Sequence, residues 1–304
     1  MTYIDLLISG ILAFIMVSVG LSLTERDFAL TFKRPRAYFT GVFAQMVLLP
    51  MLAFGVANVS GLPPEFQVGI LILAACPGGM TSSFLSYLLG ANAALSVSLV
   101  TTNSFIALVS VPLIVNGSLL WFMGQDTHLV LPFWDTVWQI FSITILPVVA
   151  GVLLRRKLPE FSRRVENPLK WITLALLAAL FAIKFFAGED QGGSGITVAE
   201  ILKLLPYSFA VNVLGLTVGY LAARSQGLSV KNRITIGIEV GIQNTNLAFL
   251  IAGTLIGNEA MLKPALVYAM FSFFTALVYG LVQKPDALGQ FTGRQNRAEL
   301  GSKG

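Results

Sequence analysis

Nine stretches of the chain are each about 20 residues long and mostly apolar. A hydrocarbon core of about 30 Å is spanned by one α-helix of that length. Only 12% of the 304 residues are charged, whereas a soluble domain carries about 25%. The stretches therefore predict an all-α polytopic membrane protein with nine transmembrane helices. They comprise residues 3–23, 37–59, 66–89, 93–115, 133–154, 167–187, 200–223, 234–257 and 264–282.

The basic residues gather on one side of this predicted layout. Seventeen of the 20 Lys and Arg fall in segments that face the cytoplasm if the N-terminus lies outside. Cytoplasmic loops are rich in Lys and Arg, so we expect a multi-pass protein of the plasma (inner) membrane with that orientation. Residues 285–304 would form a cytoplasmic tail. The net charge of +5 then reflects topology, so the expected partner is the lipid bilayer and not nucleic acid. Protein partners are not indicated.

Two of the predicted helices correspond through an internal repeat. An offset of about 163 residues places residues 76–79 (CPGG) against residues 239–242 (EVGI). Both segments are the polar centres of apolar helices, and the two halves run through the membrane in opposite directions. Inverted repeats with interrupted helices point to the binding site of a transporter. The alternative is that two helices simply contain glycine, which is common in transmembrane helices.

These polar centres are expected to interrupt the two helices. Pro77 lacks an N–H group, and Gly78, Gly79 and Gly241 allow the backbone to leave helical geometry. A break frees carbonyl groups at the end of one half-helix and N–H groups at the start of the next. Carbonyl oxygens suit a hard cation, and N–H groups at a helix N-terminus suit an anion. The breaks therefore predict cation and anion sites close together.

Glu239 is the only carboxylate that the layout places deep inside a span. A charged side chain there costs about 2.5–3.5 kcal/mol on insertion scales, so a functional role is the first hypothesis. Either a bound cation or a proton would neutralise Glu239; the alternative is a purely structural hydrogen-bonding role. Gln45 and Gln243 are further oxygen donors at the same depth. They could instead join helices by hydrogen bonds.

Enzyme chemistry finds little support in the sequence. His128 is the only histidine, so the paired histidines of a zinc protease are absent. No second intramembrane aspartate or glutamate is placed to form a catalytic dyad, and Cys76 is the single cysteine. We therefore expect a transporter and not an enzyme, with a non-transporting membrane receptor or binding protein as the alternative of another class.

Several motifs surround the two breaks. They are CPGG at 76–79 with Ser82, YL at 87–88, NAALSV at 92–97, EVGIQN at 239–244, and Gln45 ahead of LLP at 48–50. The chain resembles the bile acid:sodium symporter family, including its bacterial homologues, over nearly its whole length. The resemblance implies a core domain and a panel domain that move against each other to give alternating access. Carried over, the panel domain comprises residues 1–36 and 133–190, and the core domain comprises residues 37–132 and 191–284.

The resemblance also implies two sodium sites that share Glu239. The second site is matched in full by the side chains of Gln45, Glu239 and Gln243 and the backbone oxygens of Val240 and Ile242. The first is matched only by Ser82 and Ser96, because Ser83 replaces the family's asparagine and Val100 its threonine. Substrate anions of the family sit at the positions of Met80, Thr81, Asn244 and Thr245.

The expected function follows from the full match at the second sodium site and the partial match at the first. We expect a sodium-coupled symporter of an organic anion, with sodium as the coupling ion and one sodium site intact. The substrate would be bile-acid-like or a small carboxylate such as pantoate or a keto acid. A proton-coupled or uncoupled organic anion transporter is the alternative.

Overall fold

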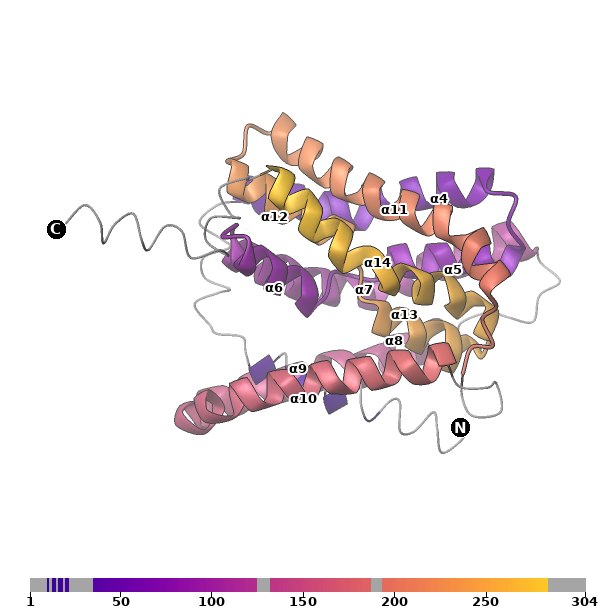
Figure 1. The fold of residues 1–304 in the computed structure, drawn as a ribbon. Helices are drawn as coiled ribbons and strands as arrows, with labels where there is room; N and C mark the ends of the chain where they lie inside the picture. The colour runs from indigo at the N-terminus through magenta and orange to yellow at the C-terminus, as the bar shows by residue number, and fades with distance from the viewer. Residues whose placement is uncertain are drawn as a thin grey trace.

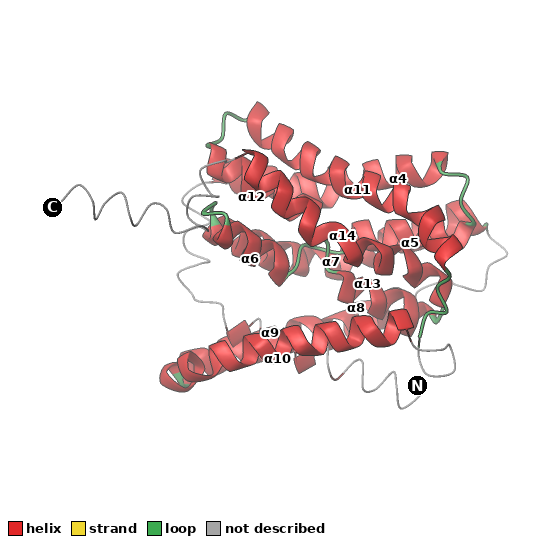
Figure 2. Ribbon diagram, viewed as in Figure 1, coloured by secondary structure: helices red, strands yellow, loops and turns green. Residues whose placement is uncertain are grey.

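A computed structural model describes residues 10, 13–14, 16–18, 20–21, 35–124, 132–186 and 193–283. Within this part of the chain all regular structure is helical (Figure 2), as the sequence predicts. The described positions between residues 10 and 21 are helical, but most of the predicted first helix lies outside the described residues. His128 and the predicted tail at 285–304 lie outside them too. The count of nine transmembrane helices and the position of the tail therefore stay predictions.

The described helices follow one another along the chain (Figure 1). Eight of the nine predicted spans, all but the first, coincide with described helical segments. In chain order these segments are α3 (Pro35–Phe43), η1 (Ala44–Leu48), α4 (Leu49–Val59), α5 (Pro64–Ala75), α6 (Met80–Leu88), α7 (Ala93–Met123), α8 (Phe133–Ile140), η2 (Phe141–Ile145), α9 (Leu146–Lys157), α10 (Pro159–Phe186), α11 (Val198–Ser225), α12 (Val230–Gly241), α13 (Thr245–Phe249), η4 (Leu250–Ile256) and α14 (Glu259–Gln283).

Within the described part, five helical segments are long and apolar enough to cross a membrane. The segment Val230–Leu255 is the most enclosed: 83% of its apolar window is buried, against 39% or less in the others. A helix surrounded by protein can carry polar groups that lipid would not tolerate. The chain is therefore a multi-pass membrane protein in which this segment lies at the centre. The other four are Pro35–Val59, Ala93–Met123, Val198–Ser225 and Glu259–Gln283.

The first predicted break lies where the sequence places it. Helix α5 ends at Ala75, residues 76–79 are non-helical, and α6 begins at Met80. Cys76 adopts an extended conformation just before Pro77, since proline disfavours the helical region for the residue ahead of it. Gly79 is also extended and precedes the first turn of α6.

The second break lies slightly later than expected. Gly241 is the last residue of α12, so the non-helical segment is residues 242–244 and begins just after the predicted glycine. Ile242 is extended, with φ −119° and ψ 116°. The side chain of Asn244 accepts a hydrogen bond from the N–H of Leu247 and so caps α13. Glu239 consequently lies in the last turn of a half-helix.

Two wide turns precede prolines inside the long helices. The π-helical segments η1 and η2 end two residues before Pro50 and Pro147, respectively. A proline cannot donate to the preceding turn and displaces the carbonyl four residues earlier, which favours a wider turn. Gln45 is a member of η1. The proline thus determines the local geometry in which this side chain points toward the breaks.

Helices α11 and α12 lie side by side (Figure 1) and approach closely through glycine. A Cβ atom at Gly215 would lie 2.6 Å from the carbonyl oxygen of Val240, and one at Gly219 would lie 2.7 Å from that of Ile236. Small residues at such positions let transmembrane helices pack backbone to backbone. Helix α11 therefore supports the half-helix that carries Glu239.

Helices α9 and α10 run side by side along one edge of the molecule (Figure 1), whereas α4 and α11 lie toward the opposite edge and α14 runs between them. Helix α8 packs against α7, and α10 reaches α14. The division into core and panel domains stays a prediction.

Candidate functional site

Glu239 lies where α12 meets α6 and α7. Its side chain is fully buried, and its Oε2 atom accepts hydrogen bonds from Ser82 Oγ at 2.8 Å and Ser96 Oγ at 3.0 Å. Ser82 is in the first turn of α6, and Ser96 is in the first turn of α7. Hydrogen bonds to an ionised group are stronger than those between neutral groups. Two serines from separate helices thus orient one oxygen of the carboxylate.

The start of α7 is held in register with α12. Asn92 caps α7, its backbone N–H donates to Thr235 Oγ1 at 2.8 Å, and its side-chain amide donates to Asn232 Oδ1 at 2.8 Å. Thr235 precedes Glu239 by four residues, and Asn92 precedes Ser96 by four, so each pair is separated by about one helical turn. The polar contact at Asn92 therefore brings Ser96 to the level of the carboxylate.

The second carboxylate oxygen has no hydrogen-bond partner. Glu239 Oε1 is buried and faces Gly78, where an added Cβ atom would overlap this oxygen and lie 3.2 Å from Ser82 Oγ. Glycine is thus required at position 78 because the carboxylate packs directly on the backbone of the break. An ionised oxygen left unpaired in a buried site is costly, so it marks a position where a cation would be favourable.

A chain of amide groups joins the two breaks. Gln45 Nε2 donates to the carbonyl of Cys76 at 3.0 Å and to Gln243 Oε1 at 2.7 Å. Gln243 Nε2 in turn donates to the carbonyl of Val240 at 2.8 Å. Gln45 is fully buried, and its Oε1 atom has no hydrogen-bond partner. The site therefore contains a second unpaired oxygen, contributed by η1.

The two non-helical segments contact each other directly. The N–H of Asn244 donates to the carbonyl of Pro77 at 2.9 Å, and a Cβ atom at Gly79 would be in ordinary contact with Asn244. Residues more than 160 positions apart in the sequence therefore meet at one point. The correspondence predicted from the repeat is consistent with this contact.

Three of the five residues predicted for the second sodium site are joined by hydrogen bonds. The side chains of Gln45 and Gln243 are joined directly, the backbone oxygen of Val240 belongs to the same chain of hydrogen bonds, and Ile242 immediately precedes Gln243. Glu239 precedes Gln243 by four residues, about one helical turn. That sodium occupies this position stays a prediction.

The residues predicted for the first sodium site are brought together only in part. Ser82 and Ser96 contact the carboxylate, and Ser83 Oγ lies 3.1 Å from Ser96 Oγ. Val100 is one turn further along α7, half-buried, and has no polar side-chain atom to offer. A sodium ion there would have fewer oxygen ligands than at the second position.

The predicted substrate positions lie at the starts of α6 and α13. Thr81 is exposed, and Asn244 and Thr245 are half-buried. The side chain of Met80 lies outside what the structure describes. The Oδ1 atom of Asn244 caps α13, and its N–H donates to Pro77. Its Nδ2 group and the hydroxyls of Thr81 and Thr245 are therefore left for a ligand.

Sequence reasoning missed several buried polar residues. Asn212, Tyr268 and Thr275 form a network at the end of α12, and Asn103 of α7 is fully buried with neither side-chain amide atom hydrogen bonded. The ion pair of Lys263 with Glu200, at 2.8 Å, was missed as well. Each was visible as a polar residue in an apolar stretch, but nothing in the sequence indicated its partner.

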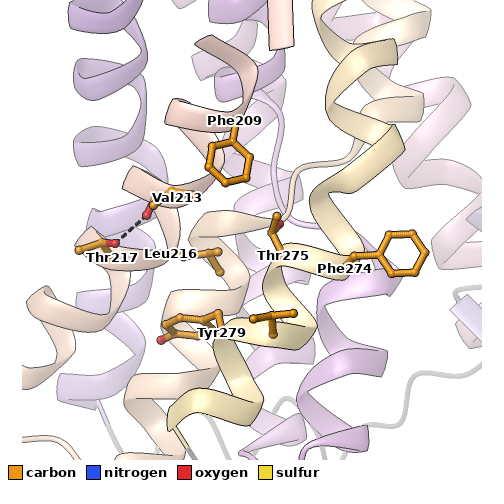
Figure 3. A pocket seen from close by; sticks show the side chains of 8 residues that line it. Phe209, Val213, Leu216, Thr217, Phe274, Thr275 and Tyr279 are labelled. Atoms are coloured by element: carbon orange, nitrogen blue, oxygen red, sulfur yellow. Dashed lines mark hydrogen bonds between the residues drawn. The ribbon is translucent and has the colours of Figure 1, made fainter. Parts of the chain in front are cut away.

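Two apolar grooves lie away from this site. One, of about 380 Å³, runs between α11 and α14 and is lined by Phe209, Phe274, Thr275 and Tyr279 among others (Figure 3). The other, of about 420 Å³, is bounded by residues of α4, α5 and α7 that include Phe54 and Trp121. Neither groove includes Glu239 or a residue of the breaks. The polar site at the breaks is therefore separate from these two apolar grooves.

The chain is similar in sequence to known sodium-coupled transporters. Residues 10–191 match the sequence model of the Sodium Bile acid symporter family. A probable sodium/metabolite cotransporter of Arabidopsis thaliana, BASS1, is 29% identical over 255 residues, 83% of this chain and 60% of that protein. The uncharacterized sodium-dependent transporter YocS of Bacillus subtilis is 28% identical over 252 residues, covering 83% of this chain and 75% of that protein. The mouse ileal sodium/bile acid cotransporter is 27% identical over 286 residues, 92% and 79% of the two chains.

The family match covers the first break but ends before Glu239, whereas the mouse cotransporter aligns over 92% of this chain. The chain spans about 60% of the length of the Arabidopsis relative. The named relatives are transporters and not enzymes, as the sequence predicts. The chain belongs to the sodium bile acid symporter family.

Proposed function

We propose that this protein is a sodium-coupled symporter that moves an organic anion across the membrane by alternating access. The observation that supports the proposal most is the pair of unpartnered buried oxygens at the contacting breaks, Glu239 Oε1 and Gln45 Oε1. Sodium is a hard cation that favours oxygen ligands, and a cation would offset the cost of the buried charge. The relatives named as sodium cotransporters support the same ion.

The proposed sodium position uses the side chains of Gln45, Glu239 and Gln243 with the backbone oxygens of Val240 and Ile242. The position near Ser83 and Val100 is proposed to be too poor in oxygen to hold a second ion. One sodium ion would then accompany one monoanion, and the cycle would be electrically neutral. A tenfold sodium gradient supplies about 1.4 kcal/mol for each ion that enters.

The anion is proposed to bind beside the breaks, at Met80, Thr81, Asn244 and Thr245. Carboxylates are favoured at these positions because the N–H groups of Met80 and Thr81, which begin α6, have no acceptor earlier in the helix. We propose a bile-acid-like anion or a small carboxylate such as pantoate or a keto acid. The proposed location is the plasma membrane, with the N-terminus outside and the core domain (37–132, 191–284) moving against the panel domain (1–36, 133–190).

A proton is the alternative coupling ion. The two hydroxyl groups at Glu239 Oε2 would accommodate a neutral carboxylic acid as well as a carboxylate, and Oε1 faces Gly78 with no hydrogen-bond partner among the described residues. A proton bound by Glu239 would move one positive charge across the membrane with the anion, as a sodium ion would.

Reconstitution into liposomes tests the proposal. A thermal-shift screen of carboxylates, with and without sodium, would first select a substrate, because a ligand that binds only the folded protein stabilises it. Uptake of that carboxylate should then follow an inward sodium gradient at fixed pH. Uptake that ignores sodium and follows an imposed pH gradient would support the proton alternative. Binding without counterflow would identify a receptor and not a transporter.

A further inference from the structure

The carbonyl of Gly241 is held by two side chains from outside its own helix. Asn212 Nδ2 donates to this carbonyl at 2.6 Å, and the hydroxyl of Tyr268 donates to it as well. Asn212 is on α11, and Tyr268 is on α14. Gly241 is the last helical residue before the second break, so its carbonyl has no partner further along the helix. Two neighbouring helices provide the partners that the break removes.

A third residue fixes which end of the amide faces the break. The hydroxyl of Thr275, also on α14, donates to Asn212 Oδ1 at 2.5 Å, and Asn212 Nδ2 lies 3.2 Å from the Tyr268 hydroxyl. Because the oxygen of the Asn212 amide is occupied by Thr275, its NH₂ group is directed to Gly241. Asn212 and Tyr268 are fully buried, whereas Thr275 is half-buried and lies at the groove between α11 and α14 (Figure 3).

The backbone oxygens beside Gly241 are those that the proposed sodium site uses. The carbonyl of Val240 precedes it and accepts from Gln243 Nε2, and the carbonyl of Ile242 follows it. The peptide between Gly241 and Ile242 is planar, so fixing the Gly241 carbonyl also fixes the N–H and Cα of Ile242. Any rotation of that peptide would change where the Ile242 carbonyl points. The N–H of this peptide also donates to the carbonyl of Ile238 at 2.9 Å, so the peptide is held from both sides.

We propose that Asn212, Tyr268 and Thr275, here called the Gly241 clamp, are positioning residues for sodium binding. The inference rests on the proposed function, since it assumes that sodium binds at the second break. The Gly241 clamp holds the backbone of the break in the geometry that presents the Val240 and Ile242 oxygens to the ion. Helices α11 and α14 thereby contribute to sodium affinity without touching the ion.

A structural role alone would have a different signature. If the Gly241 clamp served only to satisfy a buried carbonyl, its loss would lower thermal stability and leave the affinity for sodium unchanged. A positioning role predicts that the affinity for sodium falls as well, because the ligand oxygens lose their fixed arrangement. The half-saturating sodium concentration therefore separates the two roles.

The experiment uses the purified full-length protein and sodium chloride alone as the probe. Sodium is titrated against choline chloride at constant ionic strength, and the half-saturating concentration is read from the thermal shift. Tyr268→Phe and Thr275→Val each remove one hydroxyl from the Gly241 clamp. Thr275→Ser keeps the hydroxyl. Ser208→Ala is the matched control, since Ser208 Oγ donates to the carbonyl of Pro264 at 3.4 Å and joins the same two helices away from the break.

We expect Tyr268→Phe and Thr275→Val to raise the half-saturating sodium concentration about tenfold. Thr275→Ser and Ser208→Ala should bind sodium as the wild type does, even where their thermal midpoint without sodium is lower. Unchanged sodium affinity in both Tyr268→Phe and Thr275→Val would overturn the inference. A wild-type protein that ignores sodium would overturn the proposed function too, so the wild-type titration tells the two failures apart.

Discussion

Replacing Glu239 with glutamine should make the protein more stable in the absence of sodium and should abolish sodium binding. The side chain is fully buried, and its Oε2 atom accepts from two serines while Oε1 is unpartnered. Glutamine has the same shape, and its amide oxygen can keep both serine hydrogen bonds. The NH₂ group would then occupy the place of Oε1. The variant thus removes the buried charge and places a donor where a cation requires an acceptor.

The magnitudes follow from this arrangement. A buried charge without a partner costs about 3–5 kcal/mol, so Glu239→Gln should be more stable than the wild type in sodium-free, alkaline buffer by up to that amount. A carboxylate about 4 Å from a cation contributes about 4 kcal/mol at an effective dielectric constant of about 20. Sodium affinity should therefore fall about a thousandfold. Sodium at a hundred times its Kd would stabilise the wild type by about 2.7 kcal/mol, and the variant not at all.

Thermal unfolding of purified protein, with sodium replaced by choline in matched samples, measures both effects. The variant should have the higher midpoint without sodium, and only the wild type should gain stability when sodium is added. Glu65→Gln is the control, because Glu65 lies in the first turn of α5, at the opposite end of that helix from the first break. A sodium-induced shift of wild-type size in Glu239→Gln would refute the reasoning, as would a variant less stable than the wild type in sodium-free buffer.

Further substitutions test other parts of the site. Gly78→Ala should displace the buried carboxylate, cost about 1–3 kcal/mol of stability and abolish sodium-dependent uptake in liposomes. Gly79→Ala is its control: the added Cβ atom would make only ordinary contacts, so this variant should transport normally. Gln45→Leu should raise the half-saturating sodium concentration for uptake at least about tenfold, and an unchanged value would remove this side chain from the sodium site. The double variant Ser83→Asn with Val100→Thr should turn electrically silent uptake of a monocarboxylate into uptake with an inward current; a current already present in the wild type would contradict the one-ion account.

The spans were predictable because membrane thickness sets their length, but hydropathy does not determine where a helix ends. Helix α7 continues to Met123, beyond the predicted end at 115, and α10 begins at Pro159, before the predicted start at 167. The α10 extension contains the charged residues Glu160, Arg163, Arg164 and Glu166, and charged side chains are compatible with a helix that leaves the apolar core of the membrane. In α7 the residues Asn116 and Ser118 interrupt the apolar pattern, although apolar residues follow them to the end of the helix. A pattern of apolar residues therefore does not mark either helix end.

The first break was located correctly because proline and two glycines determine it locally. The second lacks a proline, and its position depends on the Asn244 cap and on side chains from α11 and α14. Those tertiary contacts carry no signal in the local sequence. For the same reason Asn212 and Tyr268 were missed, although Gln45 and Gln243 were found as polar residues in apolar spans.

The central claim is that one sodium ion enters with each anion through the site at Glu239. Sodium-22 and a labelled carboxylate, selected by the thermal-shift screen, can be counted together as they enter liposomes that contain the wild-type protein. The account predicts a ratio of one to one with no accompanying current, and loss of both fluxes in Glu239→Gln. Anion uptake without sodium-22 entry would contradict it.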